Sequence, residues 1–591
     1  MPSSRSMLKL LLHLWSFFSP RRRVQFFLLL TLMLLVSISE ILSIGIIIPF
    51  LGVLTSPERI FELSFAKHFI QFFELSEPSQ LLLPITVIFC ILALTAGLMR
   101  LMLLWVNTRL SFSTGADLGV QIYQRTLYQS YEVHCSRNSS EIINVISGKT
   151  NEVINLINMV LTVISSAIIL IAILCAILFV NPLMAFLAFG SFGFIYFVII
   201  RSTRKKLLLN SKLVAQQSTY VIKSLQEGLG GIRDVLLNAN QTSYCELFRS
   251  ADQSMRRAQA SNTFIAASPR YLMEALGMVL IAVLAYTLTK QTDGISKAIP
   301  VLGALAISAQ RLLPVLQQAY SSWSWIQASR SSLQDTLELL DQSLPNYAKH
   351  LAIQPIVFNQ SIKLDQVGFH YKPNSSFILN QISLNISKGS RVGFIGSTGS
   401  GKSTLLDIIM GLLQPTSGSL KIDNQLITPE NNRSWQMHIA HVPQSIFLAD
   451  SSIEENIAFG VPKSEIDHHR VIQAARQAQI DESIQRWPEK YQTFVGERGI
   501  RLSGGQRQRI GIARALYKQA DVIIFDEATS ALDSETEQAV MHAIESLSKE
   551  LTLLIIAHRL STLKNCTQVV ELAGGKIKKN GSYKDFVNQL I

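Results

Sequence analysis

The chain contains 591 residues, of which 48% are hydrophobic and 16% are charged, and this balance is too apolar for a purely soluble protein. The long apolar runs all precede about residue 320, and the rest has the composition of a soluble α/β protein, so two modules are expected. A net charge of +12 could indicate nucleic-acid binding. We expect no nucleic acid as a partner, because seven of the basic residues flank apolar runs, as the positive-inside bias of membrane proteins predicts. These residues are Arg21, Arg22, Arg23, Arg201, Arg204, Lys205 and Lys206.

Six apolar segments are each long enough for the roughly 20 residues that cross a bilayer as a helix. They cover residues 24–54, 81–107, 156–180, 183–200, 264–289 and 298–318. Basic clusters precede the first segment and follow the fourth, which places both clusters on the same side of the membrane. We therefore predict a multi-pass membrane domain with cytoplasmic N- and C-termini.

Two long polar connections, residues 108–155 and 201–263, keep helical periodicity, so they are predicted to extend the spans as helices. The chain should reverse near 131–140 and 228–234, where polar and glycine-containing stretches interrupt the pattern. In segment 58–75, four phenylalanines recur at helical spacing. This pattern fits both an external amphipathic helix at the membrane surface and a helix packed on neighbouring spans.

A helix over residues 331–340 leads into a proline-containing linker, and short strand-like segments begin at Ile362. We therefore divide the chain into a six-helix membrane domain (1–340), a linker (341–360) and a soluble domain (361–591). The expected fold class is a polytopic α-helical membrane domain fused to an α/β domain.

A phosphate-binding loop lies between the apolar strand Arg391–Ile395 and an apolar helix, which is the context that such a loop requires. Its glycines let backbone N–H groups approach phosphate at a helix N-terminus. Lys402 would neutralise the β and γ phosphates, and Ser403 would supply an oxygen to Mg²⁺. The predicted ATP-binding residues here are Gly396, Ser397, Thr398, Gly399, Ser400, Gly401, Lys402, Ser403 and Thr404.

A second apolar strand, Val522–Phe525, ends in two adjacent acids. This arrangement suits nucleotide hydrolysis, because one carboxylate can hold the metal ion and the other can polarise the attacking water. We assign Asp526 to Mg²⁺ and Glu527 to water activation.

Between these two motifs lies the sequence Leu502-Ser503-Gly504-Gly505-Gln506, which opens a basic helix and resembles the signature of ABC proteins. The resemblance implies that Tyr371 stacks on adenine, that Gln444 senses Mg²⁺, and that His558 is the catalytic switch histidine. It also implies that Asp533, in the stretch 530–533, belongs to the loop at the dimer interface. Residues 493–499 resemble the segment of exporter ATPases that contacts the membrane domain.

In ABC proteins the signature of one subunit closes over the nucleotide bound by the other. Ser503, Gly505 and Gln506 are therefore expected to complete the site of a partner subunit. Because every catalytic position matches the family pattern, the resemblance implies a homodimer in which both sites are active.

Five ionisable residues fall inside the predicted spans, where charge is costly and usually functional. They are Glu40, Arg100, Arg270, Glu274 and Arg311. Arginine forks suit phosphate oxygens, so the three arginines are candidate contacts for an anionic, phosphorylated substrate. A structural alternative is that Arg270 pairs with Glu274 on one helical face while Arg100 snorkels to the interface.

Residues 268–277, the span around Glu40 and residues 310–314 resemble bacterial flippases for lipid-linked oligosaccharides. This resemblance implies that a polyprenyl pyrophosphate sugar moves from the cytoplasmic to the outer leaflet of a bacterial inner membrane. Export of lipid A, another lipid, a peptide or a drug remains an alternative. An ATP-gated channel or regulator is the alternative from another class, although the intact Glu527 favours steady hydrolysis.

Overall fold

The computed structural model describes residues 6–55, 57–61, 71, 76–180, 182–289, 294–349, 354–372, 375–527, 537–539, 542, 550–557 and 563–587. The chain divides into two compact units. The first contains Met1–Gln129 and Arg137–Ser343, and the second contains Ser130–Ser136 and Leu344–Ile591.

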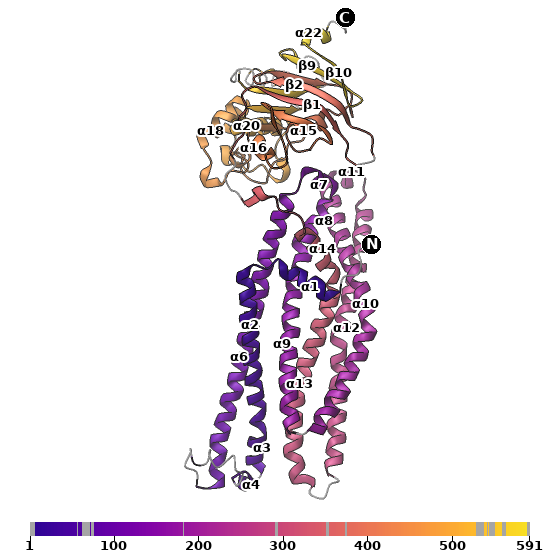
Figure 1. Ribbon diagram of the computed structural model, residues 1–591, viewed down its shortest axis with the longest axis vertical. Helices are drawn as coiled ribbons and strands as arrows, with labels where there is room; N and C mark the ends of the chain where they lie inside the picture. Colours follow the sequence, from indigo (N-terminus) through magenta and orange to yellow (C-terminus); the bar gives the residue numbers. More distant parts are fainter. Residues whose placement is uncertain are drawn as a thin grey trace. The chain divides into compact units, whose positions relative to one another are not determined.

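The first unit is a bundle of long helices that run side by side (Figure 1). Each of the six predicted spans lies in one of them, with the first span continued by α3 (Ile47–Thr55). The helices are α2 (Pro20–Gly45), α6 (Leu82–Leu127), α9 (Thr150–Val180), α10 (Pro182–Gly230), α12 (Gln241–Thr289) and α13 (Gly294–Ala328). Within the described residues, three stretches are long and apolar enough to cross a membrane, namely Pro20–Ser43, Pro78–Leu127 and Ser139–Cys175.

The helical extensions and both predicted reversals are confirmed. Helix α6 continues far beyond its span, and α7 (Tyr131–Ser136), α8 (Ser139–Ile143) and a π-helical turn (Asn144–Lys149) connect it to α9. Helix α10 likewise continues to Gly230, where α11 (Ile232–Leu237) leads into α12. Of the segment 58–75, only the end of α4 (Pro57–Phe61) and residue 71 are described, so the expected external helix lies mostly outside the described residues.

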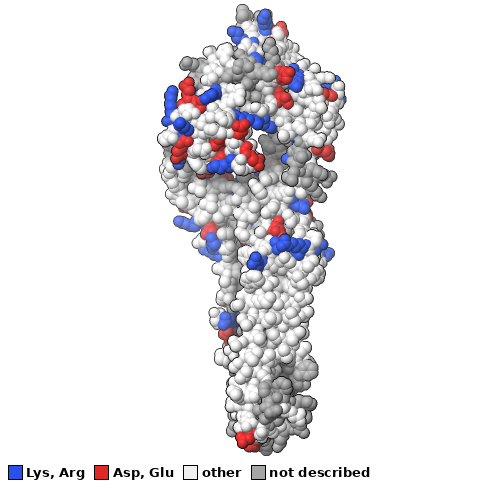
Figure 2. Space-filling model, turned by 90° about the vertical axis from the view of Figure 1, so that its left-hand side faces the viewer, with Lys and Arg blue, Asp and Glu red and all other residues white. Residues whose placement is uncertain are grey.

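Uncharged side chains dominate much of the surface of the helical unit (Figure 2). The apolar residues of that surface include Leu94, Leu98 and Leu101 on α6, which are 68%, 66% and 66% exposed. Such exposure would be unfavourable in water, whereas lipid tails accept these side chains without cost. The surface therefore fits a helical domain embedded in a bilayer.

The second unit contains two sheets. The four-stranded antiparallel sheet has the order β2-β1-β4-β5, from strands β1 (Ser361–Phe369), β2 (Leu379–Ser387), β4 (Ser417–Ile422) and β5 (Gln425–Leu426). The six-stranded sheet has the order β10-β9-β3-β8-β7-β6, from strands β3 (Arg391–Ile395), β6 (Ile439–Val442), β7 (Val522–Asp526), β8 (Thr552–Ile556), β9 (Gln568–Ala573) and β10 (Lys576–Gly581). Its central strands β7 and β8 are buried along most or all of their length, as expected for parallel strands covered on both faces.

Helices cover both faces of the six-stranded sheet. Helix α15 (Lys402–Ile409) packs between the two sheets, in a core closed by the fully buried Trp435 of α16 (Asn432–Gln436). The Trp435 indole N–H donates to the Ile409 carbonyl at 2.7 Å, so this polar atom is satisfied inside the core. A second core lies on the opposite face, under the helices α17 (Ile453–Ile457), α18 (His468–Gln477), α19 (Asp481–Gln485) and α20 (Gly504–Lys518). The described chain ends with α22 (Tyr583–Val587).

A buried ion pair ties the start of α9 to α14 (Arg330–Leu340). Lys149 is only 5% exposed, and its ammonium lies 2.6 Å from a carboxylate oxygen of Asp335. The two partners differ in access to water, because the Asp335 side chain is 39% exposed. Removing one partner should therefore have different consequences from removing the other.

We predict that Asp335→Asn lowers the free energy of unfolding by on the order of 3 kcal/mol, because it removes the hydrogen-bonded counter-charge of the buried Lys149 ammonium. Lys149→Met should lower the free energy of unfolding by about 1 kcal/mol or less, because methionine keeps the packed side-chain stem and water can still solvate Asp335. Thermal unfolding of the full chain in detergent would measure both effects. Asp252→Asn, which removes an exposed pair with Arg256, is the matched control, and a less stable Lys149→Met than Asp335→Asn would contradict the argument.

Candidate nucleotide site

Parallel pairing brings the predicted motifs of the second unit to one edge of the six-stranded sheet. Strand β8 pairs in parallel with both β3 and β7, and β7 pairs in parallel with β6. The carboxyl ends of these strands therefore meet at one edge, where ligands bind in open α/β sheets. The phosphate loop follows β3, the two acids lie at the end of β7, and Gln444 follows β6 by two residues.

Glycine geometry shapes the phosphate loop. Gly396, Gly399 and Gly401 have φ values of 148°, 80° and 100°, which side chains rarely adopt. A Cβ atom on Gly396 would lie 2.2 Å from the Leu572 carbonyl oxygen, and one on Gly401 would lie 2.7 Å from the Leu379 side chain. The loop therefore needs glycine for both its backbone conformation and its close packing.

The residues of the loop fit a phosphate group. The Lys402 ammonium donates to the carbonyl oxygens of Gly396 and Ser397 at 2.8 and 3.0 Å, so its charge sits over the loop. Ser400 is 3% exposed, and its hydroxyl oxygen is a buried polar atom that has no hydrogen-bond partner among the described residues. Such an orphaned group is costly unless a ligand satisfies it. Together with the first turn of α15, these groups make a site for polyphosphate.

The two acids at the end of β7 lie at the same edge and next to Gln444. The Gln444 side-chain amide donates to a carboxylate oxygen of Glu527 at 2.7 Å. Glu527 has a φ of 51°, a left-handed conformation that is uncommon for a residue with a Cβ. Burial and the neighbouring Glu527 raise the pKa of Asp526, whereas the Lys402 ammonium lowers it. Asp526 therefore faces the phosphate loop, where its carboxylate and the Ser403 hydroxyl are oxygen ligands suited to Mg²⁺.

Sequence reasoning missed one acid in this region. Asp407 lies in the second turn of α15, and burial together with the Asp526 carboxylate raises its pKa to about 6. Two carboxylates thus share the space beside a single lysine ammonium, so the region has capacity for an added cation. Asp407 was missed because its position inside an apolar helix carries no motif.

The signature segment begins α20 with a capping box. The Ser503 hydroxyl accepts from the Gln506 backbone N–H at 3.2 Å, and the Gln506 side chain accepts from the Ser503 N–H at 2.9 Å. Ser503 is exposed, and its O–H can still donate a hydrogen bond. The cap therefore presents a rigid helix N-terminus with an unused hydroxyl donor.

Some of the remaining predicted residues are described by the structure, and others lie outside the described residues. Tyr371 is 46% exposed just beyond β1 and packs edge-to-face with Phe369 at 4.9 Å, so its ring has a fixed position. His558 comes two positions after the last residue of β8 in the sequence and lies outside the described residues. Asp533 also lies outside them. Residues 493–499 are described, and they include an isolated bridge from Phe494 to Ser452.

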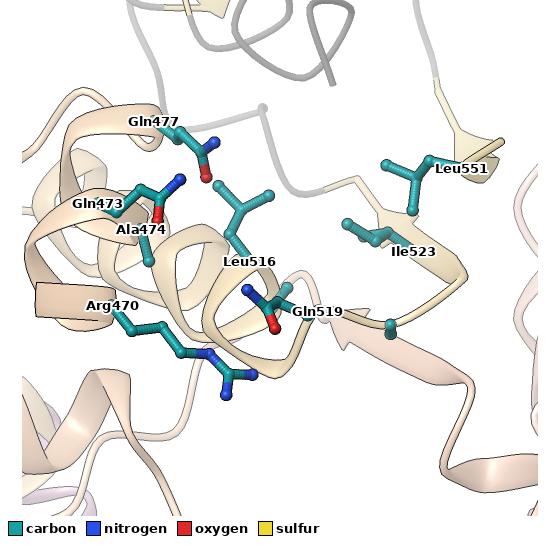
Figure 3. A pocket seen from close by; sticks show the side chains of 10 residues that line it. Arg470, Gln473, Ala474, Gln477, Leu516, Gln519, Ile523 and Leu551 are labelled. Carbon is teal, nitrogen blue, oxygen red and sulfur yellow. The ribbon is translucent and has the colours of Figure 1, made fainter. Parts of the chain in front are cut away.

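A separate hollow in the second unit does not coincide with this site. It has a volume of about 260 Å³ and is lined by residues of α18, α20 and β7 together with Leu551 (Figure 3). Arg470 and Gln477 line it from α18, and Gln519 closes the end of α20. Its lining includes no predicted nucleotide residue, so the phosphate-loop edge remains the candidate site.

In the first unit, two of the three predicted substrate arginines are paired with glutamate. Arg270 and Glu274 form a hydrogen-bonded ion pair at 2.7 Å within α12, as the structural alternative expected. Arg100 forms an ion pair with Glu40 of α2, whose side chain is 1% exposed, rather than snorkelling alone. The guanidinium side chains stay accessible, at 43% for Arg100 and 63% for Arg270. Arg311 lies in α13, but its side chain is outside the described set.

Comparison with known proteins identifies both units. A family described as "ABC transporter transmembrane region" matches residues 24–296, and one described as "ABC transporter" matches residues 379–530. The chain is 29% identical over 507 residues to an ATP-dependent lipid A-core flippase of Cupriavidus metallidurans, covering 84% of each protein. It is 30% identical over 406 residues to an ATP-dependent lipid A-core flippase of Alkalilimnicola ehrlichii, covering 68% of each.

A solved structure of a bacterial Atm1-family ABC exporter with ATP bound has the same fold. Its TM-score is 0.76 over 96% of each chain, at 23% sequence identity. These findings confirm the predicted fold class, in which a helical membrane domain is fused to an ATPase domain. The chain therefore belongs to the ABC exporters, which hydrolyse ATP to move substrates across a membrane.

Proposed function

We propose that the chain forms a homodimer that moves a phosphorylated, sugar-bearing lipid from the cytoplasmic to the outer leaflet of a bacterial inner membrane, with both termini in the cytoplasm. The observation that carries this proposal is the presence of accessible guanidinium groups inside predicted spans, where ionisable side chains are rare and usually functional. The sequence predicts a lipid-linked oligosaccharide as the substrate, and the names of the relatives refer to a lipid A core. Both combine phosphate, sugar and long apolar chains.

The ion pairs are compatible with phosphate binding. A guanidinium group has five N–H donors, and the carboxylate of Glu274 takes one of those of Arg270 at 2.7 Å. In the other pair, Glu40 is buried while Arg100 remains accessible. Each glutamate thus fixes the direction of an arginine fork whose remaining donors can bind phosphate oxygens. The apolar surface of the same helices suits the lipid chains.

At the nucleotide site, the proposed roles combine the geometry of the described residues with the resemblance to ABC proteins. Glu527, whose carboxylate accepts from Gln444, is proposed to take a proton from the attacking water, and His558 is proposed to stabilise the transferred phosphate. Asp526, Ser403 and Gln444 are proposed to hold Mg²⁺, which when bound offsets the charge of the phosphates. The exposed hydroxyl of Ser503 and the backbone of Gly505, beside the capping Gln506, would contact the nucleotide of the second copy. Asp533 is proposed to lie at that dimer interface.

Reconstitution in liposomes tests the substrate class. A panel of polyprenyl pyrophosphate sugars, lipid A, neutral lipids, peptides and drugs should show ATP-dependent translocation of the phosphorylated glycolipids alone. Those substrates should also stimulate ATP turnover, because transport and hydrolysis are coupled in a pump. An ATP-gated channel would instead pass ions without substrate-stimulated turnover.

The first prediction from the proposed function concerns hydrolysis. Glu527→Gln should reduce ATP turnover by about 10²-fold or more while ATP still binds, because the amide keeps the shape but cannot take a proton. Turnover and nucleotide binding of purified protein in nanodiscs would separate these effects. Glu465→Gln, an exposed residue far along the chain from both acids, is the control, and normal turnover by Glu527→Gln would refute the assignment.

A second prediction tests whether two copies share their sites. Lys402→Ala and Ser503→Arg should each inactivate a homodimer, because every composite site then carries one lesion. In a mixed dimer with one subunit of each kind, both lesions fall in one site and the other site is intact. Defined mixed dimers should therefore regain up to about half of the wild-type ATPase activity. Activity no higher than that of either mutant homodimer would argue against independent, shared sites.

The third prediction concerns the arginines. Arg100→Ala, Arg270→Ala and Arg311→Ala should each reduce glycolipid translocation about tenfold or more while leaving unstimulated ATPase activity intact, because they remove phosphate contacts. Lysine at the same positions should rescue only in part, since it keeps the charge but loses the fork. Arg249→Ala, at an exposed position in the polar half of α12, is the control.

The outcome that overturns this substrate assignment is specific. If the arginines only pair with Glu40 and Glu274, their alanine variants would fold in low yield but transport normally per folded molecule. Removal of both partners of a pair would then restore the yield.

A further inference from the structure

Helix α1 (Met7–Ser16) crosses the long helices of the first unit rather than running along them (Figure 1). One face of α1 is buried in the bundle through Leu10 and Leu14, which are 3% and 2% exposed. On the other face Leu8 and Leu12 are 67% and 61% exposed. The His13 imidazole lies 2.9 Å from a carboxylate oxygen of Asp341, which helps to fix the helix in place. The exposed leucines are therefore held in position.

A cavity of about 280 Å³ lies between α1, α2 and α9, and we call it the α1 cavity. Leu12 lines it from α1, Phe27 and Leu30 line it from α2, and Ile164 lines it from α9. The Trp15 ring packs against Phe27 with a centroid distance of 6.3 Å and forms part of the same wall. All thirteen lining residues are leucine, isoleucine, valine, phenylalanine or tryptophan. The cavity therefore suits an apolar ligand, because a polar ligand would find few hydrogen-bond partners in it.

Two walls of the α1 cavity belong to stretches that are apolar enough to cross a membrane. Its α2 and α9 walls belong to Pro20–Ser43 and Ser139–Cys175, which are both apolar and long enough to cross a bilayer. Phe27 and Leu30 lie seven and ten residues after Pro20, which corresponds to about 10 to 15 Å along a helix. If the start of α2 lies at the membrane surface, these residues reach the upper part of the hydrocarbon region.

Exposed basic residues lie close in the sequence to the residues that line the α1 cavity. Lys9 follows the lining residue Leu8, and Arg21 is the second residue of α2; both are exposed. The neighbouring arginines have structural partners: Arg22 pairs with Asp117 at 2.7 Å, and Arg23 donates to the Ser16 carbonyl at 2.9 Å. Basic side chains at this level attract the phosphate of anionic lipids.

We propose that the α1 cavity holds one acyl chain of an anionic phospholipid from the leaflet nearest the N-terminus, with the lipid phosphate at Lys9 and Arg21. The apolar lining selects the chain, and the two cations select the head group. This lipid is a resident ligand and differs from the transported lipid, because its site involves none of Arg100, Arg270 and Arg311. The inference is therefore independent of the substrate assignment.

Quenching of Trp15 fluorescence tests the proposal. The full chain is placed in nanodiscs that contain phosphatidylglycerol or phosphatidylcholine with brominated acyl chains, because bromine quenches a nearby indole. The difference between the wild type and Trp15→Phe isolates the Trp15 signal from the other tryptophans. Half-maximal quenching should need about thirtyfold less phosphatidylglycerol than phosphatidylcholine, as expected for two favourable charges.

Two sets of variants make the result specific. The double variant Lys9→Gln/Arg21→Gln should abolish the preference for phosphatidylglycerol, whereas Arg257→Gln, which removes an exposed arginine on α12, should retain it. Ile164→Phe should fill the α1 cavity and reduce quenching severalfold in both lipids. The matched control is Ile171→Phe on the same helix, because residue 171 is 62% exposed and does not line the cavity.

Three outcomes would overturn the proposal. Equal quenching by both lipids would show that the site has no preference for an anionic head group. An absence of quenching would show that protein, either the first residues of the chain or a second copy, fills the α1 cavity. Quenching that is unchanged in Ile164→Phe would show that Trp15 contacts only bulk lipid. If Ile164→Phe does not fold, the Lys9→Gln/Arg21→Gln comparison still decides whether the head group is selected.

Discussion

The parallel hydrogen bonding of β3, β8, β7 and β6 is the constraint on which the ATPase site depends. Parallel strands that share a sheet place all their carboxyl ends at one edge, so residues more than 100 positions apart in the sequence become neighbours. This pairing brings Lys402, after β3, close enough to Asp526, at the end of β7, to offset part of the rise in the pKa of Asp526 that burial and Glu527 cause. It also allows the amide after β6 to donate to Glu527 at 2.7 Å. If one of these strands changed its place in the sheet, Lys402, Asp526, Gln444 and Glu527 would no longer be neighbours.

The sequence was sufficient to predict elements whose residues follow a regular pattern. The six spans, their helical extensions and the strand-loop-helix at the phosphate loop all have periodic or motif signals, and the helices and strands lie where these signals put them. The positive φ values of Gly396 and Gly401 also follow from the motif, because only glycine tolerates both the conformation and the close contacts. Local patterns of this kind need no knowledge of distant neighbours.

Features that depend on distant neighbours could not be predicted. The pKa of Asp407 is raised because β7 places Asp526 beside α15, and nothing in the local sequence indicates this. The left-handed conformation of Glu527 is likewise set by its surroundings, since its N–H donates to the Ile556 carbonyl and its side chain accepts from Gln444. Such a strained residue persists only where neighbouring contacts hold it, which is typical of catalytic positions. Pairing of the arginines with Glu40 and Glu274 was one hypothesis from the sequence, but the sequence could not show that Arg100 is the partner of Glu40, which is 60 positions away on another helix.

The ion pairs of the helical unit show how the same chemistry can serve different purposes. In the pair of Lys149 with Asp335, the cation is buried and the carboxylate is accessible, so the carboxylate's main effect is to neutralise a charge that water cannot reach. The pair of Arg100 with Glu40 has the opposite arrangement, because the carboxylate is buried and the guanidinium is accessible. A buried anion that holds an accessible cation leaves positive donors available to an incoming anion. The identity of the buried partner therefore distinguishes the Lys149–Asp335 pair, which neutralises a buried cation, from the Arg100–Glu40 pair, whose cation stays accessible.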